Sequence, residues 1–537
     1  MADEIIAKVR DCIQSQKNFL LSGGAGSGKT YTLMQVLDII RETSLMANIA
    51  CITYTNVAAD EIKSRSPYKN IRVSTIHDFL WGIIEGYQHN LKQALVHLVE
   101  IYKIDPNNGI KYTGDDEITL EYYNSTKIVY KDYRKLEKGV VWHDDVVKLA
   151  DYMFAKYPLL GKILKDRYPY ILVDEYQDTD KRVIKILLDY IQKTDCKGNN
   201  TIGFFGDSMQ SIYDKSGVGN IDNYVANKSV VSITKEDNYR CSTSVINLLN
   251  LLRSDIHQKP AGNNLEGAIK LIYSSTGKSI KDIKKLDIFK CWSFSDTENT
   301  KELYLTHRLV GAELGISPIL DIYRKQKGNA DYLLGDKDHR DVLINHVIEI
   351  QNIIYLYDTK RYNELINKID FKLTRLSDKS KLKESIERLK SNAKTLCDLI
   401  RIADEEDLLK IDNRLSNYKI AEPQLYSDVI TLDITQIQHV YNYTEGYSPY
   451  STQHGVKGAE FENVLVVLDN GNWNQYNFIK LLESNMSNQQ LYDRTLKLFY
   501  VCCSRAKDNL VVYIDKPTRL AVEGAIKLFG EDNVIKI

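Results

Sequence analysis

Residues 23–30 read GGAGSGKT, and this stretch constrains the fold of the chain more than any other. It fits the pattern G-x-x-x-x-G-K-[ST], in which glycines let backbone N–H groups turn towards phosphate oxygens at the start of a helix. An apolar run, NFLL, precedes the loop, and TLMQVLDII follows it with apolar residues at helical spacing. We therefore expect a strand, a phosphate-binding loop and a helix. The expected nucleotide-binding residues of this loop are Gly23, Gly24, Ala25, Gly26, Ser27, Gly28, Lys29 and Thr30.

Two acidic residues, Asp174 and Glu175, end the segment YPYILVDE, directly after its apolar run. They can supply the metal ligand and the base that the loop lacks. In a phosphate-loop ATPase, Lys29 reaches the β and γ phosphates, while the Thr30 hydroxyl and Asp174 hold Mg²⁺. Glu175 is placed to orient and deprotonate the attacking water. The sequence therefore predicts ATP as the bound nucleotide, Mg²⁺ as the cofactor and hydrolysis as the reaction.

Short apolar runs alternate with helical patterns along the chain, which indicates an α/β fold with parallel sheets covered on both faces. One set of runs is NIACITYT, RVSTIH, PYILVDE and TIGFFGD. A second set begins near residue 231 and reads VVSIT, AIKLIYS, KELYLT, NVLVVLD and NLVVYI. At 537 residues the chain is too long for one core, so each set is expected to form its own domain.

An insert is expected in each domain. The first contains a probable helix, LKQALVHLVEIY, and a predicted hairpin, DEITLEYYNSTKIVYKDY, that turns near Asn124 and Ser125. The second is mostly helical, with a 3.5-residue apolar period that favours packed helices over any binding role and runs through Leu382, Ile386, Leu389, Ala393, Leu396 and Ile400. The expected parts are a first domain (1–81 and 139–230) with an α/β insert (82–138), and a second domain (231–315 and 446–537) with a helical insert (316–445).

Composition limits the surroundings in which this chain works. Lys and Arg (71) nearly balance Asp and Glu (72), so any DNA site must be a local groove and not a basic face. No apolar run approaches the roughly 20 residues of a membrane span, so no membrane partner is expected. The eight cysteines are scattered without a C-x-x-C pair, which argues against a zinc site and fits the reducing cytoplasm.

A glycine loop and a carboxylate pair also occur in small-molecule kinases, but later segments exclude that alternative. ITYTNVAADEIKSR, VSTIHDFL, VWHDDVVKLADYMF, DSMQSIYD, KEDNYRCSTSVI, STQHGVKGAEFENVLVV and KLFYVCCSRAKDNLVV follow in order. From about residue 18 to 515, apart from the inserts, this series resembles superfamily 1A helicases of the UvrD/Rep type. The resemblance implies two RecA-like P-loop NTPase domains. The compact inserts and short tail are similar, more loosely, to the helicase subunit of Gabija-type anti-phage systems.

The resemblance assigns roles around the nucleotide. Arg240 and Arg505 match the two arginines that reach the γ-phosphate, where fixed guanidinium groups stabilise the transferring phosphoryl group. Gln210 matches the glutamine that senses the γ-phosphate and the water. Tyr239 matches the tyrosine that stacks on adenine, and Glu460 matches the glutamate that contacts the ribose.

The nucleotide site departs from the family at two places. Tyr31 stands where the family has an arginine directly after the loop, and it offers a ring for the base but no charge. No upstream glutamine motif for adenine is present, because Lys8 falls at its position. The preference for ATP over other nucleotides therefore stays open.

The resemblance also implies a single-stranded DNA site across both domains. Aromatic faces and hydroxyl or cationic contacts to phosphate suit sequence-tolerant binding of such strands. The matching residues are Tyr54 and Tyr213 as base stackers, and Thr55, Asn56, His77, Thr452, His454 and Lys457 as strand contacts. Lys215 stands where the family has a base-stacking tryptophan, in the stretch GDSMQSIYDKSG. A lysine can hold a phosphate instead, which preserves affinity but loses the grip on a base.

Two functions of different classes follow. The first is a DNA-dependent ATPase that translocates 3′ to 5′ and unwinds DNA with a single-stranded tail. The second is a DNA-terminus-sensing subunit that controls a partner nuclease in anti-phage defence, with little unwinding of its own. A nucleotide-binding scaffold without hydrolysis fits less well, since such a protein normally lacks one of the hydrolytic residues, and all of them are present here.

Overall fold

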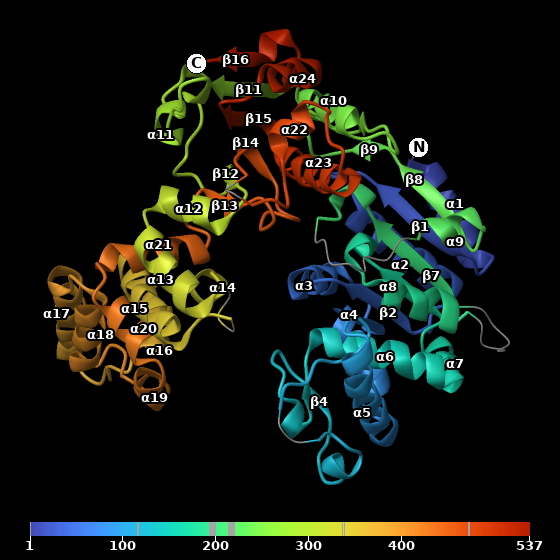
Figure 1. Ribbon diagram of the computed structural model, residues 1–537, viewed down its shortest axis with the longest axis horizontal. Helices are drawn as coiled ribbons and strands as arrows, with labels where there is room; N and C mark the ends of the chain where they lie inside the picture. Colours follow the sequence, from blue (N-terminus) through green and yellow to red (C-terminus); the bar gives the residue numbers. More distant parts are fainter. Residues whose placement is uncertain are drawn as a thin grey trace. The chain divides into compact units, whose positions relative to one another are not determined.

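The computed structural model describes residues 2–114, 117–192, 200–212, 221–335, 337, 339–470 and 473–537 (Figure 1). The chain divides into two compact units, residues 1–266 with 496–504 and residues 267–495 with 505–537. Each unit is built on a six-stranded sheet whose neighbouring strands are all parallel. The predicted α/β class with two parallel-sheet domains is confirmed.

The first sheet has the strand order β3-β2-β6-β7-β1-β8. Successive residues of its strands point to opposite faces, so Phe19 and Leu21 of β1 enter one apolar core while Leu20 enters the other. Burial on both faces explains why these strands read as continuous apolar runs. The strands are β1 (Asn18–Gly23), β2 (Ile49–Thr53), β3 (Ile71–Thr75), β6 (Tyr170–Val173), β7 (Thr201–Gly206) and β8 (Val230–Lys235).

Helices cover both faces of this sheet. Helices α1 and α2 supply apolar residues to one core, and α4 to α8 supply them to the other. The helices of this unit are α1 (Ala2–Gln14), α2 (Lys29–Thr43), α3 (Asn56–Arg65), α4 (Ile76–Ile84), α5 (Gln88–Ile104), α6 (His143–Lys156), α7 (Pro158–Arg167), α8 (Lys181–Lys185), α9 (Asp222–Ala226) and α10 (Thr243–Leu252). A short strand pair, β9 (Asp237–Asn238) with β10 (Lys259–Pro260), follows β8.

The first insert confirms its predicted helix as α5, but its predicted hairpin is wrong. A 3₁₀ turn spans Glu121–Tyr123, and the strand β4 (Val129–Tyr130) pairs with β5 (Val140–Val141) beyond the expected hairpin. Tyr123 is fully buried, and its hydroxyl donates to the Leu136 carbonyl at 2.8 Å. Burial of this ring as a turn residue overrides the alternating pattern that suggested a strand. Residue 116, the first of the predicted hairpin, lies outside the described residues.

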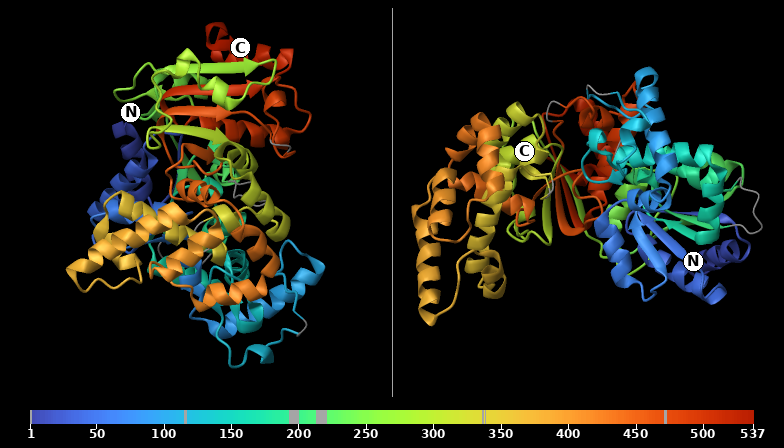
Figure 2. Two further views of the ribbon diagram at one scale, coloured as in Figure 1. Left: turned by 90° about the vertical axis from the view of Figure 1, so that its left-hand side faces the viewer. Right: turned by 90° about the horizontal axis from the view of Figure 1, so that it is seen from below.

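The second sheet has the order β13-β12-β14-β15-β11-β16 (Figure 2, left). Its strands are β11 (Ala268–Ser274), β12 (Thr300–Tyr304), β13 (Tyr450–Thr452), β14 (Phe461–Val467), β15 (Ala506–Asp515) and β16 (Val534–Lys536). The strand β8, expected to open this second set, instead pairs with β1 over Asn18 to Gly23 in the first sheet. It completes the exposed edge of β1, so the first unit extends to residue 266 and not to 230.

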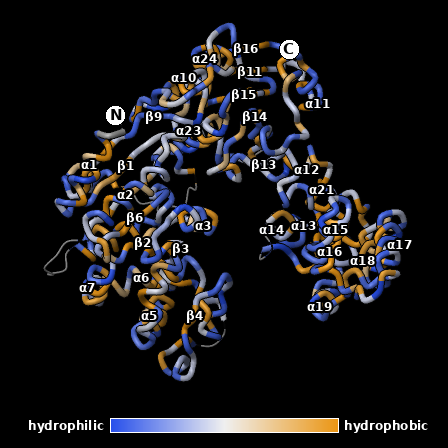
Figure 3. The backbone as a smooth tube through the Cα atoms, turned by 180° about the vertical axis from the view of Figure 1, so that it is seen from behind, coloured by the Kyte–Doolittle hydropathy of each residue, from blue (hydrophilic) through white to orange (hydrophobic). Residues whose placement is uncertain are grey.

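Helices α13 to α21 fill residues 317–444, and apolar residues recur along them (Figure 3). The predicted continuous helical period is interrupted, because α17 ends at Asn392 and α18 begins at Leu396. Thr395 caps α18: its hydroxyl accepts from the Asp398 amide at 3.2 Å, and its own amide donates to the Asp398 carboxylate at 3.2 Å. Leu389 and Leu396 nevertheless enter one shared core.

The remaining helices of the second unit complete its layers. They are α11 (Ile280–Ile283), α12 (His307–Leu314), α13 (Ser317–Lys327), α14 (Asp331–Leu334), α15 (Val342–Asp358), α16 (Tyr362–Lys368), α17 (Leu376–Asn392), α18 (Leu396–Glu405), α19 (Asn413–Ala421), α20 (Pro423–Ile430), α21 (Ile434–Thr444), α22 (Phe478–Leu482), α23 (Gln489–Cys503, its end in the first unit) and α24 (Arg519–Phe529). Within the described part of the chain, no helix has both the length and the apolar character needed to cross a membrane.

Candidate nucleotide and nucleic-acid site

The loop between β1 and α2 has the geometry of a phosphate cradle. Gly26 and Gly28 adopt left-handed backbone angles, with φ of 75° and 74°. Gly28 caps α2 without any side-chain hydrogen bond, so the first amides of the helix are open to an anion. The Ser27 hydroxyl is buried and has no hydrogen-bond partner among the described residues. These unsatisfied donors fit a bound phosphate.

Lys29 opens α2 and lies against this loop. Its Nζ donates to the carbonyls of Gly23 at 2.9 Å and Gly24 at 3.2 Å. Burial lowers the pKa of Lys29, while the negative charges of Asp207, Glu175 and Asp174 oppose that shift. The lysine therefore lies among acids at the position where the β and γ phosphates are expected, and Thr30 follows it in the first turn of α2.

The predicted acidic pair lies at the end of β6. The Asp174 amide donates to the carbonyl of Ile52 on β2 at 2.8 Å, and the Asp174 side chain is buried. Burial, together with the neighbouring Glu175 carboxylate, raises the pKa of Asp174 to about 7. Glu175 has a left-handed φ of 51°, an unfavourable angle for a residue with a side chain that often marks a functional position. A buried carboxylate next to a partly buried one fits the site of a divalent cation.

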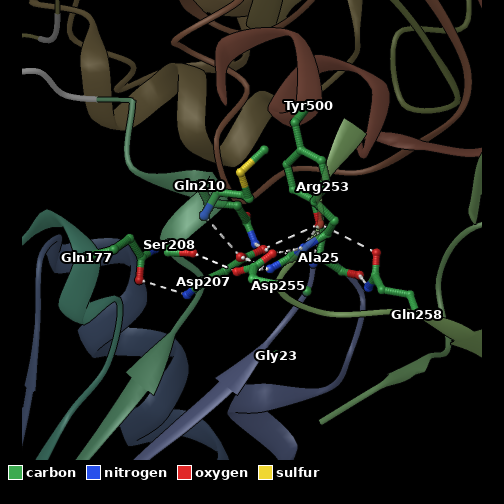
Figure 4. Close-up of polar contacts among 12 residues, drawn as sticks. Gly23, Ala25, Gln177, Asp207, Ser208, Gln210, Arg253, Asp255, Gln258 and Tyr500 are labelled. Carbon is green, nitrogen blue, oxygen red and sulfur yellow. Dashed lines mark hydrogen bonds and ion pairs between the residues drawn. The ribbon is translucent and has the colours of Figure 1, made fainter. Parts of the chain in front are cut away.

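Gln210 lies beside these acids, in the turn that follows β7. Its Nε2 donates to Asp207 Oδ2 at 2.9 Å, and Asp207 also caps the turn by accepting from the Met209 amide at 3.1 Å (Figure 4). The Asp207 amide donates to Gln177 Oε1 at 3.1 Å, and Gln177 Nε2 in turn donates to the Glu175 carboxylate. The predicted water-sensing glutamine and general base are therefore joined by a chain of hydrogen bonds.

Tyr239 and Arg240 lie on the outer side of the phosphate loop. The Tyr239 amide donates to the Gly26 carbonyl at 2.9 Å, and the Tyr239 ring lies next to Gly28. Asn238 fixes this turn, because its Oδ1 accepts from the Arg240 amide at 3.0 Å while its Nδ2 donates to the Ala25 carbonyl at 3.0 Å. The ring of Tyr239 is 50% exposed, and that of Tyr31 is 65% exposed, so both are accessible to a nucleotide base.

The two remaining nucleotide residues lie together in the second unit. Glu460 precedes β14 and Arg505 precedes β15, and these strands pair at their first residues, Phe461 and Ala506. Arg505 is almost fully buried, and its Nη1 donates to the carbonyl of Ala459 at 3.1 Å. The residues expected to contact the ribose and the γ-phosphate thus lie at the amino ends of two neighbouring central strands of the second sheet.

A cavity of about 1070 Å³ in the first unit collects four of the predicted DNA contacts, Tyr54, Thr55, Asn56 and His77. Tyr54 and Thr55 lie immediately before α3, and His77 lies in the first turn of α4. The amino ends of two helices therefore open into the cavity, where their partial positive charge favours phosphate.

Other lining residues of this cavity were not selected from the sequence. Tyr130 comes from the first insert, and its hydroxyl is hydrogen-bonded to Nδ1 of His143 on α6. The rings of His143 and His77 lie 5.0 Å apart. Arg134 also lines the cavity and pairs with the buried Asp145 at 2.5 Å. The segment VWHDDVV already indicated family likeness around His143, but nothing in the sequence brought Tyr130 or Arg134 to this site.

The other predicted DNA contacts fall elsewhere. Tyr213 and Lys215 lie outside the described residues. In the second unit, Thr452 ends β13, and His454 Nε2 is hydrogen-bonded to the Tyr476 hydroxyl at 2.7 Å.

Burial lowers the pKa of His454 to about 4, so this residue is neutral at physiological pH and offers a strand no positive charge. Lys457 lies three residues further along the chain and is partly buried. Trp473, 40% exposed, adds a ring 6.0 Å from that of His454. An aromatic surface therefore accompanies the predicted contacts here.

Comparisons with known proteins agree with this geometry. A family model described as AAA domain matches residues 7–216. The chain is 27% identical to the Gabija protein GajB of Bacillus cereus over 98% of this chain and 97% of that protein. It is 26% identical to DNA helicase II of Rickettsia typhi over 44% of this chain and 42% of that protein. It is 27% identical to the ATP-dependent DNA helicase PcrA of Bacillus subtilis over 47% of this chain and 40% of that protein.

These matches differ in extent. The two helicases are covered over less than half of their length, whereas the Gabija protein is covered almost completely. The resemblance inferred from the motifs is confirmed: this chain is similar to DNA helicases of the PcrA and helicase II type over a little less than half of its length, and to a Gabija protein over nearly all of it.

Proposed function

We propose that this chain is an ATPase activated by single-stranded DNA, of the UvrD-like type. One observation carries the proposal. Asp174 and Glu175 directly follow β6 at the expected nucleotide site, and Asp178, only three residues after Glu175, lines the same cavity as Tyr54. A single turn, Tyr176–Asp178, therefore connects the expected general base to the expected nucleic-acid site. We expect a DNA strand bound in the cavity to change the position of Glu175 through this turn.

The residues divide the hydrolytic work. Lys29 and the loop amides bind phosphate oxygens, and Thr30 with Asp174 would hold Mg²⁺, which neutralises phosphate charge when bound. Glu175 accepts a proton from the attacking water, which Gln210 orients. Arg240, with Arg505 from the second unit, stabilises charge on the transferring phosphoryl group. Stacking of the base on Tyr239 and contact of Glu460 with the ribose complete the nucleotide site.

ATP hydrolysis is proposed to move the protein along single-stranded DNA from 3′ to 5′ and to separate the strands of a duplex. In the proposed DNA path, Tyr54 and Tyr213 stack on bases, while Thr55, Asn56 and His77 in the first unit and Thr452, His454 and Lys457 in the second contact the strand.

A second candidate function rests on the extent of the similarity. Similarity to the Gabija protein covers nearly both whole chains, while similarity to the two helicases covers less than half of each. The second candidate is therefore a cytoplasmic DNA-terminus-sensing subunit that controls a partner nuclease in anti-phage defence. Lys215, in place of a stacking tryptophan, favours weak unwinding in this candidate.

One experiment separates the two candidates. We expect single-stranded DNA to raise the ATPase rate, and we would measure strand separation on a 3′-tailed duplex for the wild type and for Lys215→Trp. Clear unwinding by the wild type supports the helicase. Activated ATPase with little unwinding, improved by Lys215→Trp, supports the sensing subunit. An ATPase rate that DNA does not change would contradict both.

Glu175→Gln should retain nucleotide and DNA binding but lower turnover by about 10²–10⁴-fold, because an amide cannot accept the proton. Lys29→Ala should lose nucleotide binding or hydrolysis, because the phosphate charge loses its partner. The measurements are fluorescent-nucleotide binding and phosphate release. A matched control is Glu42→Gln, which removes an exposed carboxylate paired with Arg10 at 2.6 Å. Near-normal turnover in Glu175→Gln would show that another group is the base.

Tyr54→Leu should weaken single-stranded DNA binding about 5- to 150-fold, because base stacking on an aromatic ring contributes about 1–3 kcal/mol. Tyr54→Phe retains the ring and should bind within about threefold of the wild type. Tyr133→Leu is the control, since Tyr133 lies in the first insert, is 51% exposed and is not among the residues that line the cavity. Fluorescence anisotropy with a labelled oligonucleotide measures all three. Equal affinities for Tyr54→Leu and Tyr133→Leu would remove Tyr54 from the strand path.

A further inference from the structure

A buried charged cluster adjoins the phosphate loop and consists of residues to which the sequence assigned no role: Asp207, Arg253, Asp255 and Tyr500 (Figure 4). Its centre is Arg253, directly after α10, whose side chain is fully buried. Arg253 Nη2 lies 3.0 Å from Asp207 Oδ1, Nε lies 2.8 Å from Asp255 Oδ1, and Nη1 donates to the Tyr500 hydroxyl at 2.8 Å. A buried guanidinium with this many partners holds them in one arrangement, since loss of a carboxylate partner leaves charge uncompensated and loss of the tyrosine leaves a buried N–H group without its hydrogen bond.

On one side, this cluster reaches the hydrolytic residues through Asp207. The same carboxylate that pairs with Arg253 accepts from Gln210 Nε2 at 2.9 Å. Through its backbone amide, Asp207 also holds Gln177, which donates to the Glu175 carboxylate. Arg253 touches neither the expected water nor the phosphates, but it orients the group that orients Gln210.

On the other side, the cluster reaches the phosphate loop through Tyr500. The Tyr500 hydroxyl lies 3.4 Å from the Ala25 amide nitrogen and 3.4 Å from Gln258 Oε1. Gln258 Nε2 donates to the Ala25 carbonyl at 3.0 Å, so both polar groups of the Ala25 residue are engaged. Gly24 leaves room for this contact, because a Cβ there would lie 2.2 Å from Gln258 Nε2.

Tyr500 connects the cluster to a segment that is distant in sequence from the phosphate loop. Tyr500 belongs to the short segment 496–504, which packs in the first unit although the residues on both sides of it belong to the second. Arg505, the expected phosphate-contacting arginine, follows this segment directly. The cluster therefore joins the phosphate loop, the water-sensing glutamine and the segment that leads to the arginine.

We propose that Arg253 and Tyr500 are positioning residues for hydrolysis, which hold Gln210 and the phosphate loop in one arrangement through Asp207 and Ala25. This proposal rests on the proposed ATPase function. It assigns to Tyr500 a role in turnover and not in nucleotide affinity, because its contacts orient groups that act during the reaction. Small displacements of such groups lower rates more than they lower ground-state binding.

The test compares Tyr500→Phe with Tyr123→Phe in the full chain, in the presence of single-stranded DNA. Tyr123 is an equally buried tyrosine of the same unit, and its hydroxyl donates to the Leu136 carbonyl outside the nucleotide site. Each variant loses one hydroxyl and keeps its ring. We expect kcat of Tyr500→Phe to fall at least tenfold, fluorescent-nucleotide affinity to change less than about threefold, and Tyr123→Phe to retain wild-type kcat.

A double-mutant cycle tests the route through Asp207. Arg253→Lys keeps the charge but loses the forked contacts, so kcat should fall in the wild-type background. In a Gln210→Ala background the same change should have a markedly smaller effect, because the group being positioned is absent. Equal fold-changes in both backgrounds, or a Tyr500→Phe kcat equal to that of Tyr123→Phe, would overturn the proposal while leaving the ATPase function intact. A wild-type chain without any ATP hydrolysis would overturn the proposed function as well.

Discussion

Parallel pairing of three neighbouring strands is the constraint on which the site depends. Strand β7 pairs with β1 on one side and with β6 on the other, all in one direction. Their carboxyl ends therefore lie at one edge of the sheet, where the chain turns through Gly23, Asp207 and Asp174. Ligands of open parallel sheets bind at this edge. Side chains of the first unit, among them Gln177 and Gln258, hold these three turns next to one another by hydrogen bonds.

Several charged side chains gather at this edge of the sheet, and most of them are buried, so each lies close to a group of opposite charge or is crowded by one of like charge. Asp174 and Glu175 crowd each other beside Lys29, while Asp207 is matched by the buried Arg253. Asp174 and Glu175 are the acids expected to serve a metal ion and a water at this edge. Asp207, whose charge is neutralised within the protein, can serve purely as an orienting group.

The fold class, and the placing of the loop residues and acids next to one another, could be predicted because the evidence is local in sequence; their roles at a nucleotide stay a prediction. The loop, the strand ending at Asp174 and the motif residues Tyr239 and Arg240 each depend on a few adjacent residues. The failures depend on contacts between distant residues. The turn around Tyr123 is fixed by burial, and the break between α17 and α18 is fixed by a capping box at Thr395 that the apolar period conceals.

Residues that act at a distance were also missed for a physical reason. Tyr500 contacts a loop that lies 475 positions earlier, and Tyr130 reaches the cavity only because the insert packs on α6. No spacing rule connects such positions. In contrast, β8 was recognised as a strand but given to the wrong sheet, since an apolar run shows that a strand forms without showing which neighbour it pairs with.

The central proposal is that the nucleotide site hydrolyses ATP and that Arg505 stabilises the transferring phosphoryl group. The most direct measurement is the affinity of Arg505→Ala for ADP alone and for ADP with aluminium fluoride, a mimic of the transferring phosphoryl group. Arg519→Ala, which removes an exposed arginine of the same unit, is the control. The account predicts that Arg505→Ala loses about 10²-fold or more in affinity for the mimic while its ADP affinity stays within about threefold. Equal affinity of Arg505→Ala and the wild type for the mimic would contradict it.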